Sequence, residues 1–477
     1  MESSGLIECV LLISSNKQVI KKLPENYENQ AILKSVGEFC FPWQQVQNLD
    51  STSVQEFTFV QTQQDVVRFY GFVRLKLFEN RAIVLISKFK DFAQIFMQIL
   101  RVVEKDWANI NENNTSSNPS SSSLITLSND STSLFTLSPN TLAPGEHIYL
   151  PLTDSKNLQA IAPDNRYLQR TENCQYLLEF VAYYKNGKSP NMHRLKALIS
   201  IYCSIMHERV IILLSENLSI VTSILHAFSN LIFPLKWEHM FTPILPSSMI
   251  QYVGAPFPAL IGIHKSLLFE AEAFIDKSNV LIVDLDNTNT SPVINDPFND
   301  EKSLPGEVVS FLLEKLEKIE TQSDELAQTF LDAQAKLLAG YHSSFKIDLD
   351  RKLQYSFDEF PGIKRKWIMK HKHPYFEVMI TLQCFKQFID NQLDALNKNS
   401  RPPPYSAVFD EAVRKVENDN QLTAAFSFAK AKAKTVSKTA AMKIKAKNGK
   451  KYKREYYVVF WEKRERERTR ETFLLVI

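Results

Sequence analysis

The chain has 477 residues, 44% of them hydrophobic, and a formal net charge of +3. Because a single hydrophobic core does not grow to this size, we expect two or three domains. A net charge this small for the length gives no sign of nucleic-acid binding, so only local charge runs can point to such partners.

The five cysteines predict reduced, buried thiols in a cytosolic protein. Their number is odd, they are widely spaced and no two form a CxxC pair; they are Cys9, Cys40, Cys174, Cys203 and Cys384. No zinc-ligand spacing is present, so we expect no metal and no other cofactor. The N-terminal apolar run is short and lacks a basic segment before it, and no stretch reaches about 18 uncharged apolar residues. The sequence therefore predicts neither a signal peptide nor a transmembrane helix.

Residues 1–103 predict a small antiparallel sheet with helices packed on it. Strands are expected where apolar residues alternate or run together, over residues 6–13, 56–60, 68–75 and 81–87. We interpret the FCFP run at residues 39–42 as the end of an extended segment, because Pro42 disfavours helical geometry at Phe41. Apolar residues at helical spacing predict an amphipathic helix over residues 92–103.

Residues 104–145 predict a disordered linker. Between residues 109 and 144 the composition is reduced almost to Asn, Ser, Thr and Pro. So little apolar content cannot offset the entropy lost on ordering. The density of Ser and Thr permits phosphorylation, and a loop insertion without function is the alternative.

Residues 146–290 predict a mostly parallel sheet flanked by helices. Helices are expected over residues 195–206 and 218–232, and strands over residues 210–214, 260–264 and 280–284. The short β-branched runs suit strands that are covered on both faces. Ser215 or Ser219 can cap the second helix, and Pro234 stops it. The alternation of strands and helices argues for parallel strands with crossover helices.

Amphipathic helices dominate residues 300–416. They are expected over residues 308–319, 327–341, 377–396 and 409–416. The remaining residues, 417–477, begin with a basic segment that has many lysines and no acidic residue between Lys430 and Arg454.

The order of these units resembles that of a known family. The runs HERVIILLSENLSIVTSILHAFSNLIFPLKWEHMFTPILP, QYVGAPFPALIGIHKSLL and VLIVDLDN are similar to the central part of a DENN domain. FCFP, FTFVQT and RFYGFVRL resemble the upstream DENN module, and the helices after residue 305 resemble the downstream module of the connecdenn branch. The resemblance covers about residues 6–413, apart from the linker. It implies an α/β fold (α+β overall), with a longin-like N-terminal lobe, a central three-layer α/β DENN lobe and a mostly helical downstream module.

The resemblance implies a guanine nucleotide exchange factor that promotes GDP release from a Rab GTPase. Connecdenns act on Rab thirty-five in clathrin-mediated endocytosis and endosomal recycling. The expected place is therefore the cytoplasmic side of clathrin-coated vesicles, the plasma membrane and early endosomes, with a clathrin adaptor as a further partner. Such a protein regulates a GTPase and is not an enzyme of covalent chemistry. A DENN-fold trafficking scaffold without exchange activity is the alternative.

The same resemblance places the Rab switch regions in a cleft between the first two lobes. We expect surface residues at the ends of elements to make these contacts. The candidates are Phe41, Pro42, Glu208, Trp237, His239, Pro246, Pro256, Asp284 and Asn287. The pairs His207–Glu208 and Glu238–His239, with Arg209, are equally interpreted as structural polar groups at element ends.

The basic tail predicts binding to anionic lipid headgroups, including phosphoinositides, at on the order of 1 kcal/mol per surface lysine. The lysines that would carry it are Lys430, Lys432, Lys434, Lys438, Lys443, Lys445 and Lys447. No base-reading fold surrounds them, so nucleic acid is not expected, and a solvated basic helix is the bland alternative. Family members continue into a long tail with clathrin and adaptor motifs, and none is visible here, which suggests a truncated or alternatively spliced form.

Two other activities leave a trace in the sequence. Residues 281–288 form an apolar strand that ends in DxDxT, the arrangement with which haloacid-dehalogenase phosphatases attack phosphorus beside Mg²⁺. Those enzymes also need a lysine and an acidic pair on later strands, which the helical sequence after Thr288 does not offer. A GTPase-activating relative would need an arginine that projects into the cleft, and Arg68 or Arg74 could serve.

Overall fold

The computed structural model places the chain as a set of described segments. These are residues 5–43, 54–63, 67–90, 92–107, 147–153, 156–161, 192–287, 291–318, 323–341, 345–347, 353–355, 373–398 and 408–418. Residues 108–145 of the predicted linker and residues 419–477 of the predicted basic tail lie outside them. Met1–Val416 make up one compact unit.

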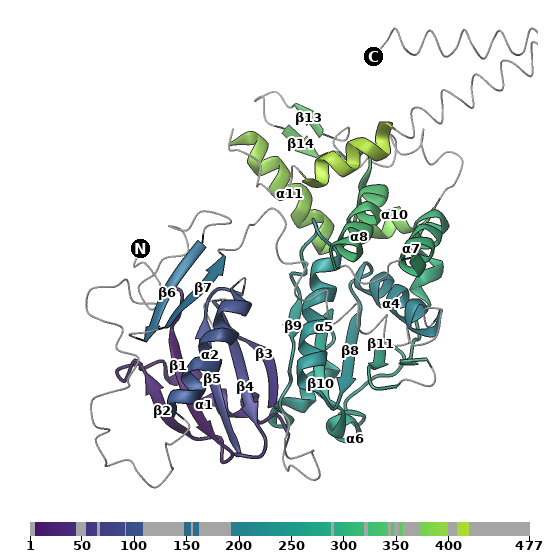
Figure 1. Ribbon diagram of the computed structural model, residues 1–477. Coiled ribbons are helices and arrows are strands. Elements are labelled where there is room, and N and C mark those ends of the chain that lie inside the picture. Colours follow the sequence, from purple (N-terminus) through teal and green to yellow (C-terminus); the bar gives the residue numbers. More distant parts are fainter. Residues whose placement is uncertain are drawn as a thin grey trace, which may run out of the picture. The chain divides into compact units, whose positions relative to one another are not determined.

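A five-stranded antiparallel sheet forms the first lobe (Figure 1). Its strands are β1 (Cys9–Ser14), β2 (Val19–Leu23), β3 (Val54–Thr62), β4 (Arg68–Lys76) and β5 (Arg81–Ser87), in the order β2-β1-β5-β4-β3. The predicted antiparallel sheet and its strands are confirmed, because β3 and β4 pair as a hairpin and β5 pairs with both β4 and β1.

Two helices pack against opposite faces of this sheet. The alternation of β1 sends Leu11 into a core with α1 (Gln30–Cys40) and Leu12 into a second core with α2 (Ala93–Trp107). The prediction of an extended segment before FCFP is wrong, because α1 runs through Phe39 and Cys40. Apolar residues at helical spacing outweigh the signal from Pro42, which acts only on Phe41, where φ is −126° and ψ is 76°.

The second lobe contains the predicted mostly parallel sheet. Its strands are β8 (Val210–Ser215), β9 (Met240–Thr242), β10 (Ala259–His264), β11 (Val280–Asp284) and β12 (Val293–Asn295), in the order β12-β11-β8-β10-β9. Only β12 is antiparallel to its neighbour. One face packs against α4 (Met192–Ile205) and α5 (Leu218–Leu231), and the other against η2 (Ser247–Gly254) and α6 (Leu268–Ala271). The lobe is therefore three-layered, as expected.

Helix α5 also joins the two lobes. Its N-cap is Asn217, whose side chain accepts from the N–H of Ser219, and the predicted serine Ser215 accepts from the N–H of Asn217 itself at 2.9 Å. The N–H of Leu218 donates to Gln55 Oε1 of β3 at 3.1 Å. Three residues further along β3, Thr58 Oγ1 lies 2.8 Å from His226 Nε2 of α5. The edge strand of the first sheet is thus covered by a helix of the second lobe, which removes an exposed edge.

The downstream module is helical, as predicted. It contains η4 (Asp300–Lys302), α7 (Gly306–Lys318), α8 (Ser323–Leu338), α10 (Tyr375–Met379), α11 (Gln383–Asn397) and a helix over residues 408–418. The single helix predicted over residues 377–396 is wrong, because Leu382 is extended and separates α10 from α11. Two short antiparallel pairs complete the elements: β6 (His147–Thr153) with β7 (Lys156–Ile161), and β13 (Phe345–Ile347) with β14 (Leu353–Tyr355).

Four of the five cysteines lie within the described residues, and all four are free and buried, as predicted. Burial raises the pKa of the Cys9 thiol to about 12. None of the helices described by the structure is both long and apolar enough to cross a membrane.

Candidate functional site

The carboxyl ends of β8, β10 and β11 lie side by side at one edge of the second sheet. Ser215 at the end of β8 is in register with His264 at the end of β10, and Asp284 of β11 is in register with Leu214. Strand β8 is the central strand, with β10 on one side and β11 on the other. In open α/β sheets, ligands and partners commonly bind at such an edge. We call it the carboxyl edge.

Lys265 connects the polar groups of the carboxyl edge. Its Nζ lies 2.9 Å from Asp284 Oδ2 and 3.9 Å from Asp286 Oδ2. Asp286 also accepts from Ser215 Oγ at 2.6 Å and from the N–H of Glu216 at 2.8 Å. The hydrogen bond to Asp284 is the main reason why the pKa of Lys265 is raised, so the ammonium stays charged.

These contacts bear on the DxDxT motif. Its two carboxylates already bind a lysine, a hydroxyl and a backbone N–H of the chain itself. Among the residues placed by the structure, no group of three or more His, Cys, Asp and Glu side chains could hold a metal ion. The phosphatase interpretation gains no support from this geometry.

The end of α1 contacts the same region of the second lobe. The N–H of Ser247, at the start of η2, donates to the carbonyl oxygen of Pro42 at 2.7 Å. The Trp43 ring packs on the imidazole of His264 with centroids 4.8 Å apart. Burial lowers the pKa of His264, so this imidazole is neutral at pH 7. Of the predicted site residues, Phe41, Pro42 and Pro246 therefore gather at the junction of the lobes.

Asp284 is the last residue of β11, and Asn287 lies on the loop that follows it. Asn287 Nδ2 donates to the carbonyl oxygen of Ser291 at 3.2 Å, and its own carbonyl accepts from Arg194 Nη2 at 3.2 Å. Asn287 is thus held both by Ser291 and by Arg194 of α4.

A second group of predicted residues lies at the amino end of β8. Glu208 accepts from the N–H groups of Cys384 at 2.7 Å and Gln383 at 3.1 Å, and its Oε2 lies 3.0 Å from His239 Nε2. The Trp237 ring packs on His239 with centroids 5.3 Å apart. Burial works against ionisation of Glu208, but these hydrogen bonds together outweigh it and lower the pKa of the carboxyl.

Glu208 therefore caps α11 from a residue far away in the sequence. Its neighbours anchor a different element: His207 Nε2 lies 2.6 Å from Ser303 Oγ, and Arg209 binds both carboxylate oxygens of Asp300 at 3.0 and 3.1 Å. The His-Glu-Arg sequence thus links the second lobe to the downstream helices, which supports the structural interpretation of these residues.

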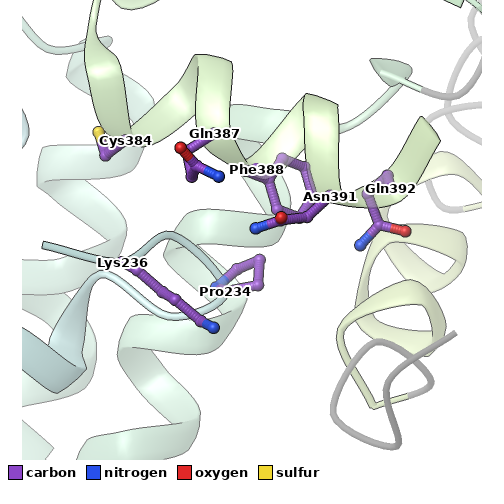
Figure 2. Close-up of a pocket in the computed structure, with 7 residues that line it drawn as sticks. All are labelled: Pro234, Lys236, Cys384, Gln387, Phe388, Asn391 and Gln392. Atoms are coloured by element: carbon purple, nitrogen blue, oxygen red, sulfur yellow. The ribbon is translucent and has the colours of Figure 1, made fainter. Parts of the chain in front are cut away.

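A small pocket lies between α11 and the segment that follows α5 (Figure 2). One face of α11 supplies most of its lining, opposite Pro234 and Lys236. The lining residues from α11 are Cys384, Gln387, Phe388, Asn391 and Gln392. The pocket thus borders the helix that Glu208 caps and shares no residue with the carboxyl edge.

The expectation that the nine candidates are surface residues is wrong for four of them, while Glu208, His239, Asp284 and Asn287 are partly exposed. Phe41 is 5% exposed and Trp237 is 7% exposed, and Pro42 and Pro246 are also buried. Pro256 is the one candidate classed as exposed. The structure brings Phe41, Pro42 and Pro246 to the lobe junction, Asp284 to the carboxyl edge and Asn287 to the loop after β11. Glu208, Trp237 and His239 lie at the other end of β8.

Other predicted residues fall elsewhere. Arg74 forms ion pairs with Glu56 and Glu104 within the first lobe. This position gives no support to its interpretation as a catalytic arginine. The seven lysines predicted to bind lipid lie outside the described residues.

Sequence reasoning missed Lys265 and a set of exposed aromatic side chains. Lys265 directly follows a buried strand, so the rule that polar groups at the carboxyl ends of parallel strands meet would have found it. The aromatic residues lie on η2, on α6 and in the loops beside them, and these elements are too short for a periodic pattern to reveal an exposed face.

Comparison with known proteins agrees with this architecture. Residues 17–76 match the uDENN domain, and residues 78–288 match the DENN (AEX-3) domain. The boundary lies in the turn between β4 and β5, so β5 belongs to the DENN match although it pairs within the first sheet. The chain therefore belongs to the DENN-domain proteins.

The relatives include DENN domain-containing proteins 1A and 1B. The chain is 30% identical to DENN domain-containing protein 1A of Mus musculus over 401 residues, 84% of the chain and 36% of that protein. It is 32% identical to DENN domain-containing protein 1B of Mus musculus over 412 residues, 85% of the chain and 48% of that protein. The chain thus spans between about a third and a half of the length of these relatives.

Proposed function

We propose that this chain is a guanine nucleotide exchange factor that promotes GDP release from a Rab GTPase. The observation that carries the proposal is the pair of adjoining uDENN and DENN matches, supported by the similarity to DENN domain-containing proteins 1A and 1B over more than four fifths of the chain. The contacts between β3 and α5 hold the two matched parts together as one binding body.

Exchange requires binding energy and no nucleophile. A protein that binds the nucleotide-free GTPase more tightly than the GDP-bound form shifts the equilibrium toward GDP release by that difference in affinity. Reversing a 1:99 population would take a preference of about 10⁴, or about 5.5 kcal/mol. The proposed activity is therefore that of a GTPase regulator without covalent chemistry.

We place the GTPase at the carboxyl edge and the adjoining lobe junction. Lys265 and Asp286 are still partly exposed there, so a partner can reach them. The buried candidates Phe41, Pro42 and Pro246 would act by holding the two lobes in register. Glu208, Trp237 and His239 would act more remotely, by positioning α11.

The finer proposals follow the family branch. They are Rab thirty-five as substrate, a role in clathrin-mediated endocytosis and endosomal recycling, an adaptor as partner, and anionic lipids bound by the basic residues after Val416. The similarity to DENN domain-containing proteins 1A and 1B supports them.

The test is release of a fluorescent GDP analogue from a panel of Rab GTPases, with the full chain at catalytic amounts. We expect acceleration on one or a few of them, with Rab thirty-five among these. Binding to a nucleotide-free Rab without faster release would instead support the scaffold alternative. Neither binding nor release on any Rab in the panel would overturn the proposal.

A pair of lysine variants tests the placement. Lys265→Met removes the cation that holds Asp284 and Asp286, and we expect slower exchange. Lys318→Met is the matched control, because Lys318 is also bound to a carboxylate, that of Glu314 at 2.7 Å on α7. Equal exchange rates for the two variants would move the site away from the carboxyl edge.

A further inference from the structure

Exposed aromatic side chains gather on η2, α6 and the loops beside them. Phe269 is 86% exposed, and Tyr252, Phe257 and Phe274 are each about half exposed. Single exposed hydrophobic residues are ordinary on protein surfaces, but a contiguous group usually marks an interaction site.

These residues belong to one continuous part of the surface. Helix α6 and η2 pack over the same face of the second sheet, with Ile250, Val253 and Ala271 buried in a shared core. A Cβ on Gly254 would lie only 2.5 Å from the carbonyl oxygen of Phe274, so the end of η2 directly contacts the segment after α6. The backbone approach therefore needs glycine, and it brings the aromatic residues of the two elements together.

The aromatic residues have an acidic rim. Glu270, Glu272 and Asp276 are exposed on and after α6, and the one nearby lysine of that segment, Lys277, is bound to Glu272 at 2.8 Å. We call these aromatic and acidic residues together the acidic aromatic patch. Its charge repels an anionic membrane and favours a protein partner with lysine or arginine around an apolar centre.

The patch continues from the carboxyl edge. Lys265, which binds Asp284 and Asp286, is the first residue of η3 (Lys265–Leu267), and η3 leads directly into α6. Phe269 follows Lys265 by four residues, about one helical turn. Figure 1 shows α6 beside the ends of β8 and β10.

We propose that the acidic aromatic patch is the anchor on which the GTPase docks, and that the docking face of the GTPase carries apolar side chains surrounded by lysine and arginine. This inference rests on the proposed exchange function and identifies the contact surface for it. Interface energy is concentrated in a few aromatic anchors with a polar rim, which the buried candidates cannot supply.

The main test replaces the most exposed aromatic residue. Phe269→Ser should reduce kcat/KM for GDP release by roughly tenfold or more, because truncating an interface hot spot costs that much affinity. Folding should be unaffected, since the side chain is 86% exposed. Leu396→Ser on α11, where the leucine is 43% exposed, is the matched control and should leave the rate unchanged.

Charge reversal tests the acidic rim independently. Glu270→Lys should reduce kcat/KM and weaken its dependence on salt, because association between opposite charges is steered and screened. Glu314→Lys makes the same charge reversal at an exposed position on α7 and should alter neither kcat/KM nor its dependence on salt. A salt dependence identical to that of the unaltered chain would contradict the predicted basic face of the partner.

The outcomes separate this inference from the exchange function. If the unaltered chain accelerates release and Phe269→Ser does so equally, the patch is not the anchor and the exchange function stands. If no Rab responds, the exchange function fails, and the affinity of the chain for nucleotide-free Rab then tests the docking proposal. Binding by the unaltered chain that is lost in Phe269→Ser would support the patch as the docking surface. Equal binding by both proteins, or no binding by either, would overturn it. Analytical ultracentrifugation of the unaltered chain and of Phe269→Ser completes the test. A dimer that forms with the unaltered chain and is lost in the variant would assign the patch to a second copy of the chain and overturn the proposal.

Discussion

The two ends of β8 carry similar polar groups in different surroundings. Before the strand, the Glu208 carboxylate is only 9% exposed and is enclosed by His239 and two backbone N–H groups of α11. Beyond the carboxyl end of β8, the side chain of Lys265, which follows the neighbouring strand β10, is 35% exposed and binds carboxylates that water also reaches. The carboxylate at the first end is thus almost closed off from water, whereas the groups at the second end stay partly open to it. The Glu208 end can thus anchor α11, whereas the Lys265 end remains accessible to a partner.

The largest effect is expected at the enclosed end. Glu208→Ala would leave two N–H groups at the start of α11 and the His239 imidazole without their acceptor, which should destabilise the fold by about 2–4 kcal/mol. Urea unfolding measures this. Glu314→Ala, which removes a fully exposed carboxylate, should show no measurable change. A Glu208→Ala protein as stable as the unaltered chain would show that α11 does not depend on this anchor.

Acid should weaken the contact between α5 and β3. Burial lowers the pKa of His226 to about 3, while an unfolded histidine titrates near 6.5. Because the folded state then binds fewer protons, the stability from this group is complete above about pH 6.5 and is lost as the pH falls below it. Between pH 7 and pH 5 the loss should be about 2 kcal/mol.

The variant His226→Gln isolates this contribution. The urea unfolding free energy of the unaltered chain should decrease more from pH 7 to pH 5 than that of the variant, by about 2 kcal/mol. Identical decreases would mean that His226 is accessible to protons in the folded protein, contrary to its packing between α5 and β3, where Thr58 Oγ1 lies 2.8 Å from Nε2.

Local sequence patterns predicted the sheets and missed what depends on distant contacts. Residues 210–214 are apolar at every position, which is typical of a strand buried on both faces, so their composition alone predicted β8. The break between α10 and α11 was missed because the N–H of Cys384, at the start of α11, donates to Glu208, which is far away along the chain. The exposure of Phe269 was missed for a related reason: only the packing of α6 on η2 decides which of its side chains face solvent.

A smaller change in stability is expected at the open end. Lys265→Met leaves Asp284 and Asp286 without their cation, but both carboxylates keep some contact with water and Asp286 keeps its other donors. We expect a loss of at most about 1 kcal/mol by urea unfolding, together with slower exchange. A loss as large as that of Glu208→Ala would mean that the two ends of β8 do not differ in the way described.

The smallest effect is expected where the lobes meet through exposed side chains. Ser248 Oγ donates to Glu38 Oε2 at 3.0 Å, but Glu38 is also bound by Lys17 at 2.7 Å, so Ser248→Ala leaves no group without a partner. The adjacent backbone hydrogen bond from Ser247 to Pro42 is untouched. Ser248→Ala should therefore change the unfolding free energy by less than about 0.5 kcal/mol. A clearly larger change would show that exposed side chains, rather than the backbone contact and the buried Trp43–His264 pair, hold this junction together.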